Sequence, residues 1–337
     1  MRRGVPVRRD GAARRRTLAV AAGLTMILAA AGCTDPDPGP DAAPPPPPAA
    51  GSTPRSAPAK PACDARASLR PAGALPAPGK MPAGGYLAAI QKRGRLVLGT
   101  SQDSPLFSSR NAFTGRVEGF DIDMGRLIAA AIFGDPGKLQ IKVIPHADRT
   151  AVLSGDEGEE GQPDAVDLVI NTMTANCARW QEVDFSTVYL ETGQKLLVAK
   201  DSAVDGLDDL AKQKVCAAVG STSLQNLENA ASDPVPVARN GWGECLVAFQ
   251  QNEVAAISTD DTILAGLAAQ DPFAKVVGER FTEEPYAVAV SKRHPDLTRF
   301  VNAVLEQSRR DGTWKTIYDR WLGALGPAPQ PPAARYR

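Results

Sequence analysis

The chain contains 337 residues, of which 43% are hydrophobic and 23% are charged, and its 38 basic residues balance its 38 acidic residues. This length and apolar content are enough for one large domain or two lobes with a buried core. The neutral balance, without a basic aromatic patch or stripe, argues against a nucleic-acid-binding protein. The two histidines, His146 and His294, lie far apart without cysteine or acidic partners at ligand spacing, so no metal site and no cofactor are expected.

The N-terminal segment 1–32 has the pattern of a secretory signal peptide of the lipoprotein type. Its first 16 residues include seven Arg, a short apolar run follows, and Gly32 precedes Cys33. The apolar run is too short for a membrane span. Cleavage before Cys33 would leave a cysteine for lipidation, which predicts an extracytoplasmic protein anchored to the outer face of the cell membrane. A soluble secreted form is the alternative.

Residues 33–83 are rich in Pro, Ala, Asp and Gly. A segment with so few large apolar residues cannot offset the entropy of ordering, and its prolines favour stiff, extended conformations, so we expect a tether. A disordered tail is expected at 326–337. The segment 155–164 is acidic and glycine-rich, which is typical of a solvated surface loop, with docking of a partner as the alternative.

Strand-like and helix-like segments alternate along the globular part, which predicts an α/β fold. In such sheets ligands bind beyond the carboxyl ends of the strands. The expected strands are 95–100, 139–145, 167–171, 215–219, 234–238, 254–258 and 286–291, and the expected helices are 120–133, one beginning at 149, one from 222, one ending near 249, one from 261, and two that include Phe300 and Trp321.

Four cysteines remain when Cys33 is set aside, an even number in a chain that is predicted to be exported. Cys216 lies in an expected strand and Cys245 in the helix after the next strand, so we expect these two to be neighbours and to form a disulfide. Cys63 with Cys177 then follows by elimination and would attach the end of the tether to the loop around Cys177. The alternative is that Cys63 and Cys177 stay free.

The most informative motif is LVINTMTANCARWQEVDFS, residues 168–186. Its strand-like run opens into a turn at Thr172 and Thr174, and Arg179 follows. Hydroxyl groups, backbone N–H groups and a planar guanidinium are the donors that bind a carboxylate. The motif therefore predicts a grip on the α-carboxylate of a free amino acid, for which no catalytic base is needed. A strand, a capping Thr and a surface Arg would be the purely structural interpretation.

The segment GFDIDM, residues 119–124, resembles the signature of the family 3 extracellular solute-binding proteins, the polar amino-acid receptors of ABC importers. Similar motifs follow in the family's order over residues 93–322, including RGRLVLGT, AISTDDTILAGLA, EEPYAVAV and DGTWKTIYDRWLG. The resemblance implies a two-lobed periplasmic-binding-protein fold of type II, each lobe a mixed sheet flanked by helices. Lobe 1 is expected at 84–198 and again at 286–325, lobe 2 at 199–285, and the hinge at 197–201 and 284–288.

The resemblance also implies a monomeric receptor, not an enzyme, that closes over an amino acid and delivers it to a membrane permease. Arg179 matches the arginine that holds the α-carboxylate, and Thr172 and Thr174 match residues that bind carboxylate and amine. Asp260 matches the acid that receives the α-ammonium from the second lobe, and Thr222 matches a donor at a helix N-terminus. Asp260 and Thr222 could instead only cap their helices.

The remaining site residues implied by the resemblance concern the ligand's amino group and side chain. Asp103 and Phe107 fall in the loop that frames the amino group and covers the side chain, although Phe107 could be ordinary core. Arg149 matches a position that reads a distal carboxylate in some acidic-amino-acid receptors, and Arg110 could point the same way. Two cationic donors favour glutamate or aspartate, with asparagine and glutamine as weaker ligands. The first-turn acids Asp121 and Asp123 are expected only to favour the helix dipole.

Two other functions are compatible with this fold. A lipid-anchored sensor would use the same closure to signal to a membrane partner. An exported dehydratase would need a poised acid or base, and Asp103, Glu118 and Glu284 are the acids near suitable loops, but none belongs to a recognisable catalytic pair.

Overall fold

The computed structural model describes residues 63–154 and 166–337. The predictions of a signal peptide, of lipidation at Cys33 and of most of the tether lie outside these residues, as does the acidic loop 155–164. Within the described ranges, no helix is both long and apolar enough to cross a membrane. No cluster of His, Cys, Asp or Glu in these ranges could hold a metal ion.

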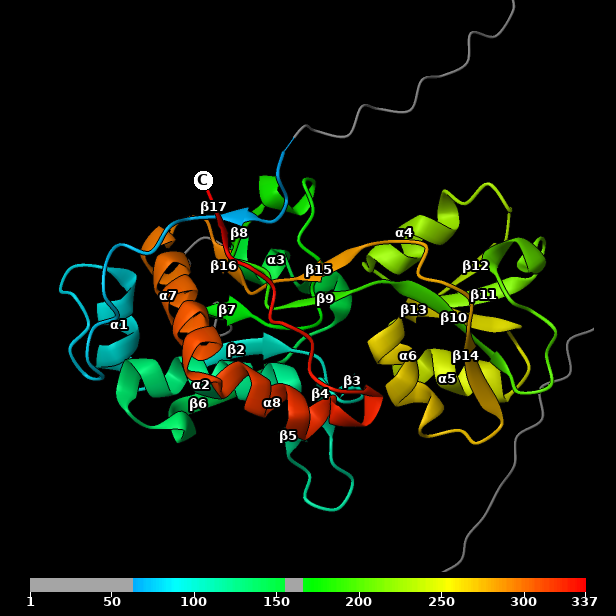
Figure 1. The fold of residues 1–337 in the computed structure, drawn as a ribbon, viewed down its shortest axis with the longest axis horizontal. Coiled ribbons are helices and arrows are strands. Elements are labelled where there is room, and N and C mark those ends of the chain that lie inside the picture. Colours follow the sequence, from blue (N-terminus) through cyan, green and yellow to red (C-terminus); the bar gives the residue numbers. More distant parts are fainter. Residues whose placement is uncertain (1–62, 155–165) are drawn as a thin grey trace, which may run out of the picture. The chain divides into compact units, whose positions relative to one another are not determined.

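Lobe 1 is built on a five-stranded sheet of order β6-β2-β7-β16-β8 (Figure 1). The strands are β2 (Leu96–Thr100), β6 (Leu139–Val143), β7 (Leu168–Val169), β8 (Val183–Phe185) and β16 (Ala289–Ser291). Its helices are α1 (Tyr86–Arg93), α2 (Phe120–Phe133), α3 (Ala151–Ser154), α7 (Pro295–Asp311) and α8 (Thr313–Trp321). A small sheet joins β3 (Asp103–Ser104), β4 (Ser108–Arg110) and β5 (Val117–Glu118).

Lobe 2 repeats this plan with the order β12-β11-β13-β10-β14. The strands are β10 (Gln194–Ala199), β11 (Lys214–Ala218), β12 (Val235–Arg239), β13 (Ala256–Asp260) and β14 (Ala274–Val277). Its helices are α4 (Thr222–Glu228), α5 (Trp242–Gln250) and α6 (Asp261–Ala268), which pack on this sheet (Figure 1). The α/β prediction is confirmed, with mixed sheets in both lobes.

The chain passes between the lobes along a two-stranded antiparallel sheet of β9 (Leu190–Thr192) and β15 (Glu284–Tyr286), in which Glu284 pairs with Thr192. The first crossing therefore precedes Gln194, and the expected crossing at 197–201 is wrong. The segment 194–199 is β10, which is flanked on both sides by strands of lobe 2. An apolar run of this kind fits the interior of either sheet, so its composition could not assign it to one.

Helix α2 shows how the sequence fixes a local element. It spans the residues that the apolar spacing predicts and buries Ile122, Ile128 and Ile132. The chain enters it through Gly119, whose φ is 143° and whose added Cβ would lie 2.1 Å from the Phe107 carbonyl oxygen. Only glycine tolerates both that backbone conformation and that approach.

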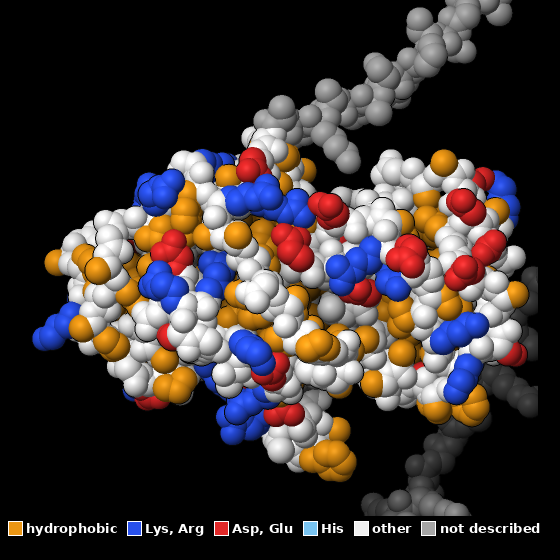
Figure 2. All heavy atoms as spheres, in the orientation of Figure 1, with side chains coloured by type: hydrophobic (Ala, Val, Ile, Leu, Met, Phe, Trp, Pro, Cys, Tyr) orange, Lys and Arg blue, Asp and Glu red, His pale blue; other side chains and the backbone are white. Residues whose placement is uncertain are grey.

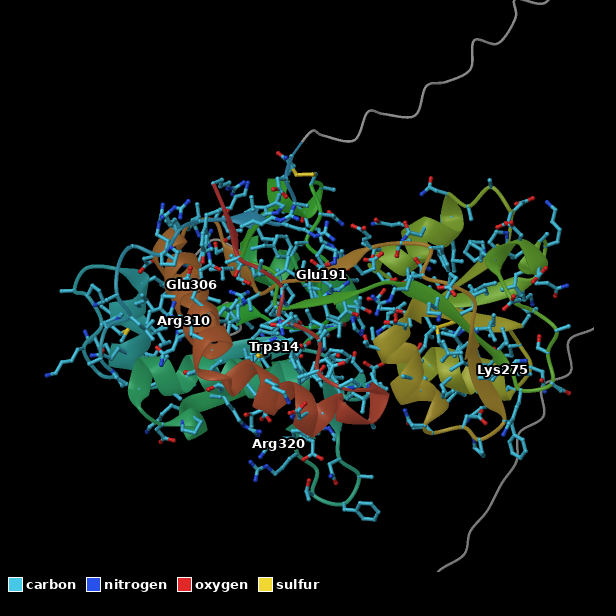
Figure 3. The ribbon with its side chains drawn as sticks, in the orientation of Figure 1. Glu191, Lys275, Glu306, Arg310, Trp314 and Arg320 are labelled. Carbon is cyan, nitrogen blue, oxygen red and sulfur yellow. A yellow bond between two sulfur atoms is a disulfide. The ribbon has the colours of Figure 1, made fainter. Side chains whose placement is uncertain are left out.

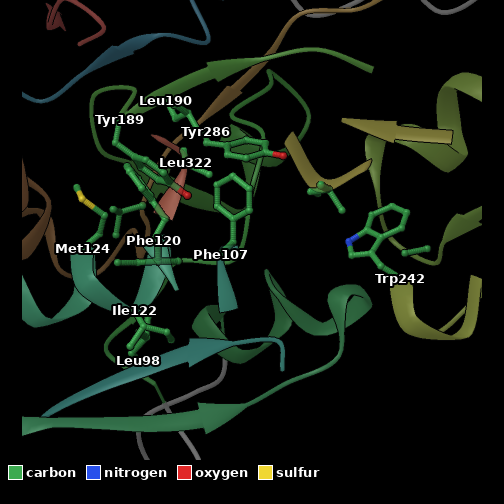
Figure 4. Packing of buried hydrophobic residues seen from close by; sticks show 14 of the residues in the cluster. Leu98, Phe107, Phe120, Ile122, Met124, Tyr189, Leu190, Trp242, Tyr286 and Leu322 are labelled. Atoms are coloured by element: carbon green, nitrogen blue, oxygen red, sulfur yellow. The ribbon is translucent and has the colours of Figure 1, made fainter. Parts of the chain in front are cut away.

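The aromatic residues of lobe 1 meet close to the hinge (Figure 4). The Phe107 ring stands edge-on to the Tyr286 ring at 5.8 Å, and the Phe120 ring stacks at 6.0 Å on Tyr189. Trp314 of α8 donates its indole N–H to the Tyr189 carbonyl at 2.8 Å (Figure 3). This packing gives the hinge strands a rigid support on the lobe 1 side.

Both ends of the described chain are ordered on lobe 1, contrary to the predicted tether up to residue 83 and the predicted disordered tail. Strand β1 (Ala67–Ser68) pairs in parallel with β17 (Arg335–Tyr336). Arg337 lies over the Trp180 ring at 4.1 Å, and the Tyr336 hydroxyl donates to Glu306 at 2.6 Å. These contacts are distant in sequence, so local composition does not reveal them.

Both predicted disulfides are present: Cys216–Cys245 inside lobe 2 and Cys63–Cys177 between the N-terminal segment and lobe 1. Arg66 strengthens the second attachment, because its guanidinium bonds Glu191 on β9 at 3.1 Å and Glu283 beside β15 at 3.0 Å. The N-terminal segment is thus attached to the residues that flank the hinge.

Candidate functional site

The candidate site collects ionic side chains from both lobes and the hinge, and all of them are buried. Arg149 and Arg179 come from loops of lobe 1, Asp260 ends β13 of lobe 2, and Glu284 opens hinge strand β15. Basic and acidic side chains are interspersed over the face seen in Figure 2, so charges of one sign do not gather there. Burial of charges carries a large desolvation cost unless partners compensate it.

Arg179 lies in the short 3-10 helix η3 (Arg179–Gln181) and is 9% exposed, which excludes the surface role. One terminal nitrogen donates to the Thr174 carbonyl at 2.7 Å, and the other donates to the Gly220 carbonyl of lobe 2 at 3.0 Å. Burial lowers the pKa of Arg179, while the charges of Glu284 and Asp260 act in the opposite direction. A buried guanidinium that reaches both lobes is well placed to bind an anion between them.

Arg149 binds three main-chain carbonyls and so ties three loops together. Its side chain donates to His146 at 2.8 Å, to Asn171 at 3.0 Å and to Gly220 at 2.9 Å. Burial lowers its pKa to about 9, and the like charge of Arg179 adds to this shift. All three guanidinium nitrogens of Arg149 thus donate to main-chain carbonyls, which holds these loops in place; for Arg179 the same kind of bond involves its two terminal nitrogens.

Gly220 of lobe 2 accepts hydrogen bonds from both guanidinium groups through its carbonyl. Its φ is +74°, and an added Cβ would lie 2.6 Å from the Ala147 Cα of lobe 1. A side chain at this position would separate the lobes, so glycine is required for the carbonyl to reach Arg149 and Arg179. A cavity of about 200 Å³ lies beside this contact, lined by Arg149, Arg179, Asn176 and Gln225 among others.

Asp260 and Thr222 lie at the N-termini of their helices, but neither uses its side chain as the cap. Ser221 caps α4 by accepting the Leu224 N–H, and Asp260 makes no side-chain capping bond. Oδ2 of Asp260 instead accepts the Tyr286 hydroxyl, and its buried Oδ1 has no hydrogen-bond partner among the described residues. Burial, and then the nearby Glu284 carboxylate, raise the pKa of Asp260 well above its ordinary value. The carboxyl therefore has one buried oxygen that is still able to accept a hydrogen bond.

Glu284 accepts hydrogen bonds from both lobes. Its Oε2 accepts the hydroxyl of Thr174 from lobe 1 at 2.6 Å and the hydroxyl of Thr222 from lobe 2 at 2.7 Å. Its Oε1 accepts the Thr282 hydroxyl at 2.8 Å and the Asn226 amide at 3.4 Å. The side chain is buried, in a residue that is 2% exposed. Sequence reasoning named Glu284 as a possible catalytic acid and as the first residue of the second hinge crossing, and it did not predict these hydrogen bonds.

Thr172 is held in place by Asp121, which sequence reasoning treated as a dipole-favouring acid alone. Thr172 has a φ of 43°, uncommon for a residue other than glycine, and its N–H donates to Asp121 Oδ2 at 2.7 Å. The other oxygen of Asp121 accepts the Tyr189 hydroxyl at 2.8 Å. Burial raises the pKa of Asp121 to about 6. The GFDID segment therefore positions the Thr172 turn from behind.

The candidate residues of the first loop have different surroundings. Asp103 accepts the Gly243 N–H of lobe 2 at 3.2 Å. Phe107 is fully buried, with its ring edge-on to Phe120 of lobe 1 and to Tyr286 of the hinge. Arg110 is exposed and bonds Gln102, which precedes β3, at 2.8 Å and the Gly115 carbonyl of its own hairpin at 2.6 Å. Arg110 therefore leaves the candidate set, because the β4–β5 hairpin directs its guanidinium to local partners.

An aromatic pair that the sequence did not point to borders the same contact. The imidazole of His146 in lobe 1 lies edge-on to the Trp242 indole of lobe 2, at 5.6 Å between ring centroids. Figure 4 shows Trp242 across from Phe107 and Tyr286, so aromatic surfaces approach the site from both lobes. A single His and a single Trp in distant segments show no spacing pattern, so the sequence could not predict that their rings pack together.

Comparisons with known proteins agree with this arrangement. The sequence profile of the bacterial extracellular solute-binding proteins, family 3, matches residues 96–324. The chain is 36% identical to the ABC transporter glutamine-binding protein GlnH of Bacillus subtilis, over 70% of this chain and 84% of that protein. It is 30% identical to the glutamate-binding protein GluB of Corynebacterium glutamicum, over 71% and 82% respectively.

Solved structures show the same fold. An ancestral arginine-binding protein, solved with arginine, superposes with a TM-score of 0.61 at 32% identity, covering 68% of this chain and 99% of that one. An ancestral arginine-binding protein solved with glutamine gives a TM-score of 0.61 at 31% identity, with the same coverage. These are two-lobed amino-acid-binding proteins, so their likeness accounts for both sheets and the hinge.

Proposed function

Because the chain belongs to the bacterial extracellular solute-binding proteins of family 3, we propose that it is the receptor of an ABC importer for a polar amino acid. The family acts outside the cytoplasm, and its named relatives are binding proteins of transport systems. The receptor would hold its ligand between the lobes and pass it to a membrane permease.

The observation that carries this proposal is the pairing of buried opposite charges from opposite lobes. Arg179 of lobe 1 supplies a guanidinium for an α-carboxylate, with the hydroxyls of Thr174 and Thr222 nearby. Asp260 of lobe 2 supplies a buried carboxyl with one oxygen still unpaired in the described part, suited to an α-ammonium. Every free amino acid carries both groups, so a zwitterion compensates both charges at once.

The ligand class we propose is glutamine or glutamate. The expectation of glutamate or aspartate rested on two cationic donors, but Arg110 points elsewhere and Arg149 is engaged by three carbonyls. Two buried acids, Asp260 and Glu284, also lie in this region. The relatives include binding proteins named for glutamine and for glutamate, which supports the class without choosing between its members.

A thermal-shift screen of the purified chain against the standard amino acids tests the proposal. A ligand present at about 100 times its Kd stabilises a protein by about 2.7 kcal/mol, which raises the melting temperature measurably. We expect glutamine or glutamate to give the largest shift. A screen in which no amino acid stabilises the protein would refute the receptor function, and arginine or histidine as the best ligand would refute the ligand class.

Membrane attachment through Cys33 is a separate part of the proposal and rests on the sequence pattern around Gly32. Expression of the full chain in a bacterial host followed by fractionation tests it. The wild-type chain should sediment with membranes and Cys33→Ser should not, whereas equal release of both would leave a soluble exported receptor.

A further inference from the structure

Glu284 holds the same two hydroxyl groups that the proposed function gives to the ligand. Thr174 and Thr222 belong to different lobes, and their hydroxyl oxygens are 3.5 Å apart. Both donate to a single oxygen of Glu284, at 2.6 and 2.7 Å. The carboxylate of the protein therefore occupies the donor pair that would receive the α-carboxylate of an amino acid.

Glu284 is also held firmly enough to remain in the site. Its second oxygen is bound by the Thr282 hydroxyl and the Asn226 amide, and Asn226 in turn donates to Gln194 at 2.8 Å. The residue lies on a hinge strand and pairs with Thr192 of the other strand. A ligand that takes the hydroxyls would thus find this carboxylate beside it and not withdrawn into solvent.

The charges of the site then decide which ligand fits. Arg179 and Asp260 would be used by the carboxylate and ammonium of any amino acid, and Glu284 remains as a further buried acid whose charge acts on both of them. A ligand with a neutral side chain adds no further charge beside it. A second carboxylate on the ligand would add an uncompensated negative charge to a buried region, which is costly because water no longer screens it.

We propose that Glu284 is a specificity-determining residue of this site, one that competes for the hydroxyls of Thr174 and Thr222 and favours glutamine over glutamate. The inference rests on the proposed function and adds a choice within its ligand class. It makes two linked claims: glutamine is the tighter ligand of the wild-type chain, and removal of the Glu284 charge narrows or reverses that preference.

Calorimetric titration of glutamine and glutamate into the mature chain tests both claims. For the wild type we expect glutamine to bind at least about tenfold more tightly, the ratio that corresponds to about 1.4 kcal/mol. Glu284→Gln removes the charge and keeps the shape, so glutamate should gain affinity relative to glutamine by about tenfold or more. The gain should appear mainly in the glutamate titration.

Glu283→Gln is the matched control, because it removes the same charge one residue earlier. The Glu283 side chain is 82% exposed and bonds only Arg66 among the described residues. Its glutamine-to-glutamate ratio should equal that of the wild type. An equal change in both variants would show that overall charge, and not the buried position, is responsible, and would overturn the inference.

The outcomes separate this inference from the receptor function. If the wild type binds neither ligand and no other amino acid, the receptor function fails and the inference fails with it. If the wild type binds glutamate more tightly, or Glu284→Gln leaves the ratio unchanged, only the inference fails. The wild-type ratio decides the first claim even if Glu284→Gln does not fold, which circular dichroism would reveal.

Discussion

The two lobes share one strand plan and differ in the charge that each brings to the site. In both sheets three parallel strands are followed by an antiparallel fourth strand, β16 in lobe 1 and β10 in lobe 2. Each fourth strand is the one that arrives from the hinge. Yet lobe 1 contributes the cations Arg149 and Arg179, and lobe 2 contributes Asp260. The shared strand plan therefore fixes where the loops of the two lobes meet, and a few loop residues give the two sides of the proposed site opposite charges.

Removing the disulfides should give the largest changes in stability, and the two disulfides attach to different lobes. In the chain-entropy model, removing Cys216–Cys245 should lower the free energy of unfolding by about 4 kcal/mol, and removing Cys63–Cys177, which closes a longer loop, by about 5 kcal/mol. Paired Cys→Ser variants and urea titration measure both. We expect only the loss of Cys63–Cys177 to weaken ligand binding, because Cys177 lies two residues before Arg179. Equal binding by both variants would show that the Arg179 loop needs no such support.

Arg179→Ala breaks the cationic half of the site. Removing one partner of a buried charge pair typically costs about 3–5 kcal/mol, so affinity for every amino-acid ligand should fall by a few hundredfold or more. Calorimetry measures the loss, and Arg116→Ala, which removes an exposed arginine of the same lobe, is the control. Near-normal affinity in Arg179→Ala would place the α-carboxylate elsewhere.

Asp260→Asn tests the anionic half. A bond to a charged partner contributes about 1.5–3 kcal/mol, so affinity should fall by about ten- to a hundredfold. Because burial and Glu284 raise the pKa of Asp260, the wild-type carboxyl becomes protonated as the pH falls through that raised value. Ligand affinity of the wild type should therefore decrease as the pH falls through that raised pKa, and Asp260→Asn should remove this part of the pH dependence.

Protonation of Asp260 should also change the free energy of unfolding, and in the direction opposite to its effect on ligand affinity. A carboxyl whose folded pKa is raised binds more protons in the folded than in the unfolded chain between the two pKa values, so its contribution to stability increases as the pH falls through that window. Thermal unfolding without ligand, compared between wild type and Asp260→Asn, measures it. Parallel pH dependence of the two proteins would contradict the raised pKa.

The sequence predicted the elements whose signals are local. Helix α2 begins and ends where its apolar spacing and its flanking glycines indicate, and α4 begins at the predicted Thr222. The pairing of β1 with β17 and the assignment of β10 to lobe 2 were not predicted. Both depend on partners far away in the chain, which local composition does not encode.

The same distinction applies to the site. Arg179, Thr174, Thr222 and Asp260 could be named from motif and resemblance, and the structure brings them together. Glu284 could not be recognised as their common neighbour, because a single acid beside a proline has no distinctive spacing. The Gly220 carbonyl was also missed, because every residue has a main-chain carbonyl and the residue type does not indicate which of them accepts a hydrogen bond in the site.

Arg149 and Arg110 were both predicted from the sequence to read a side-chain carboxylate, but the structure gives them different surroundings. Arg149→Met removes donors to three carbonyls, including the Gly220 contact with lobe 2, so it should weaken glutamine and glutamate to a similar degree, by about tenfold or more. Arg110→Ala removes an exposed side chain with local partners, so both affinities should stay within about twofold of wild type, as is usual for surface substitutions.

Calorimetry on the two variants decides whether either arginine reads the side chain of the ligand. A loss confined to glutamate in Arg149→Met would restore Arg149 as the reader of a side-chain carboxylate, and a loss in Arg110→Ala would bring the β4–β5 hairpin back into the site.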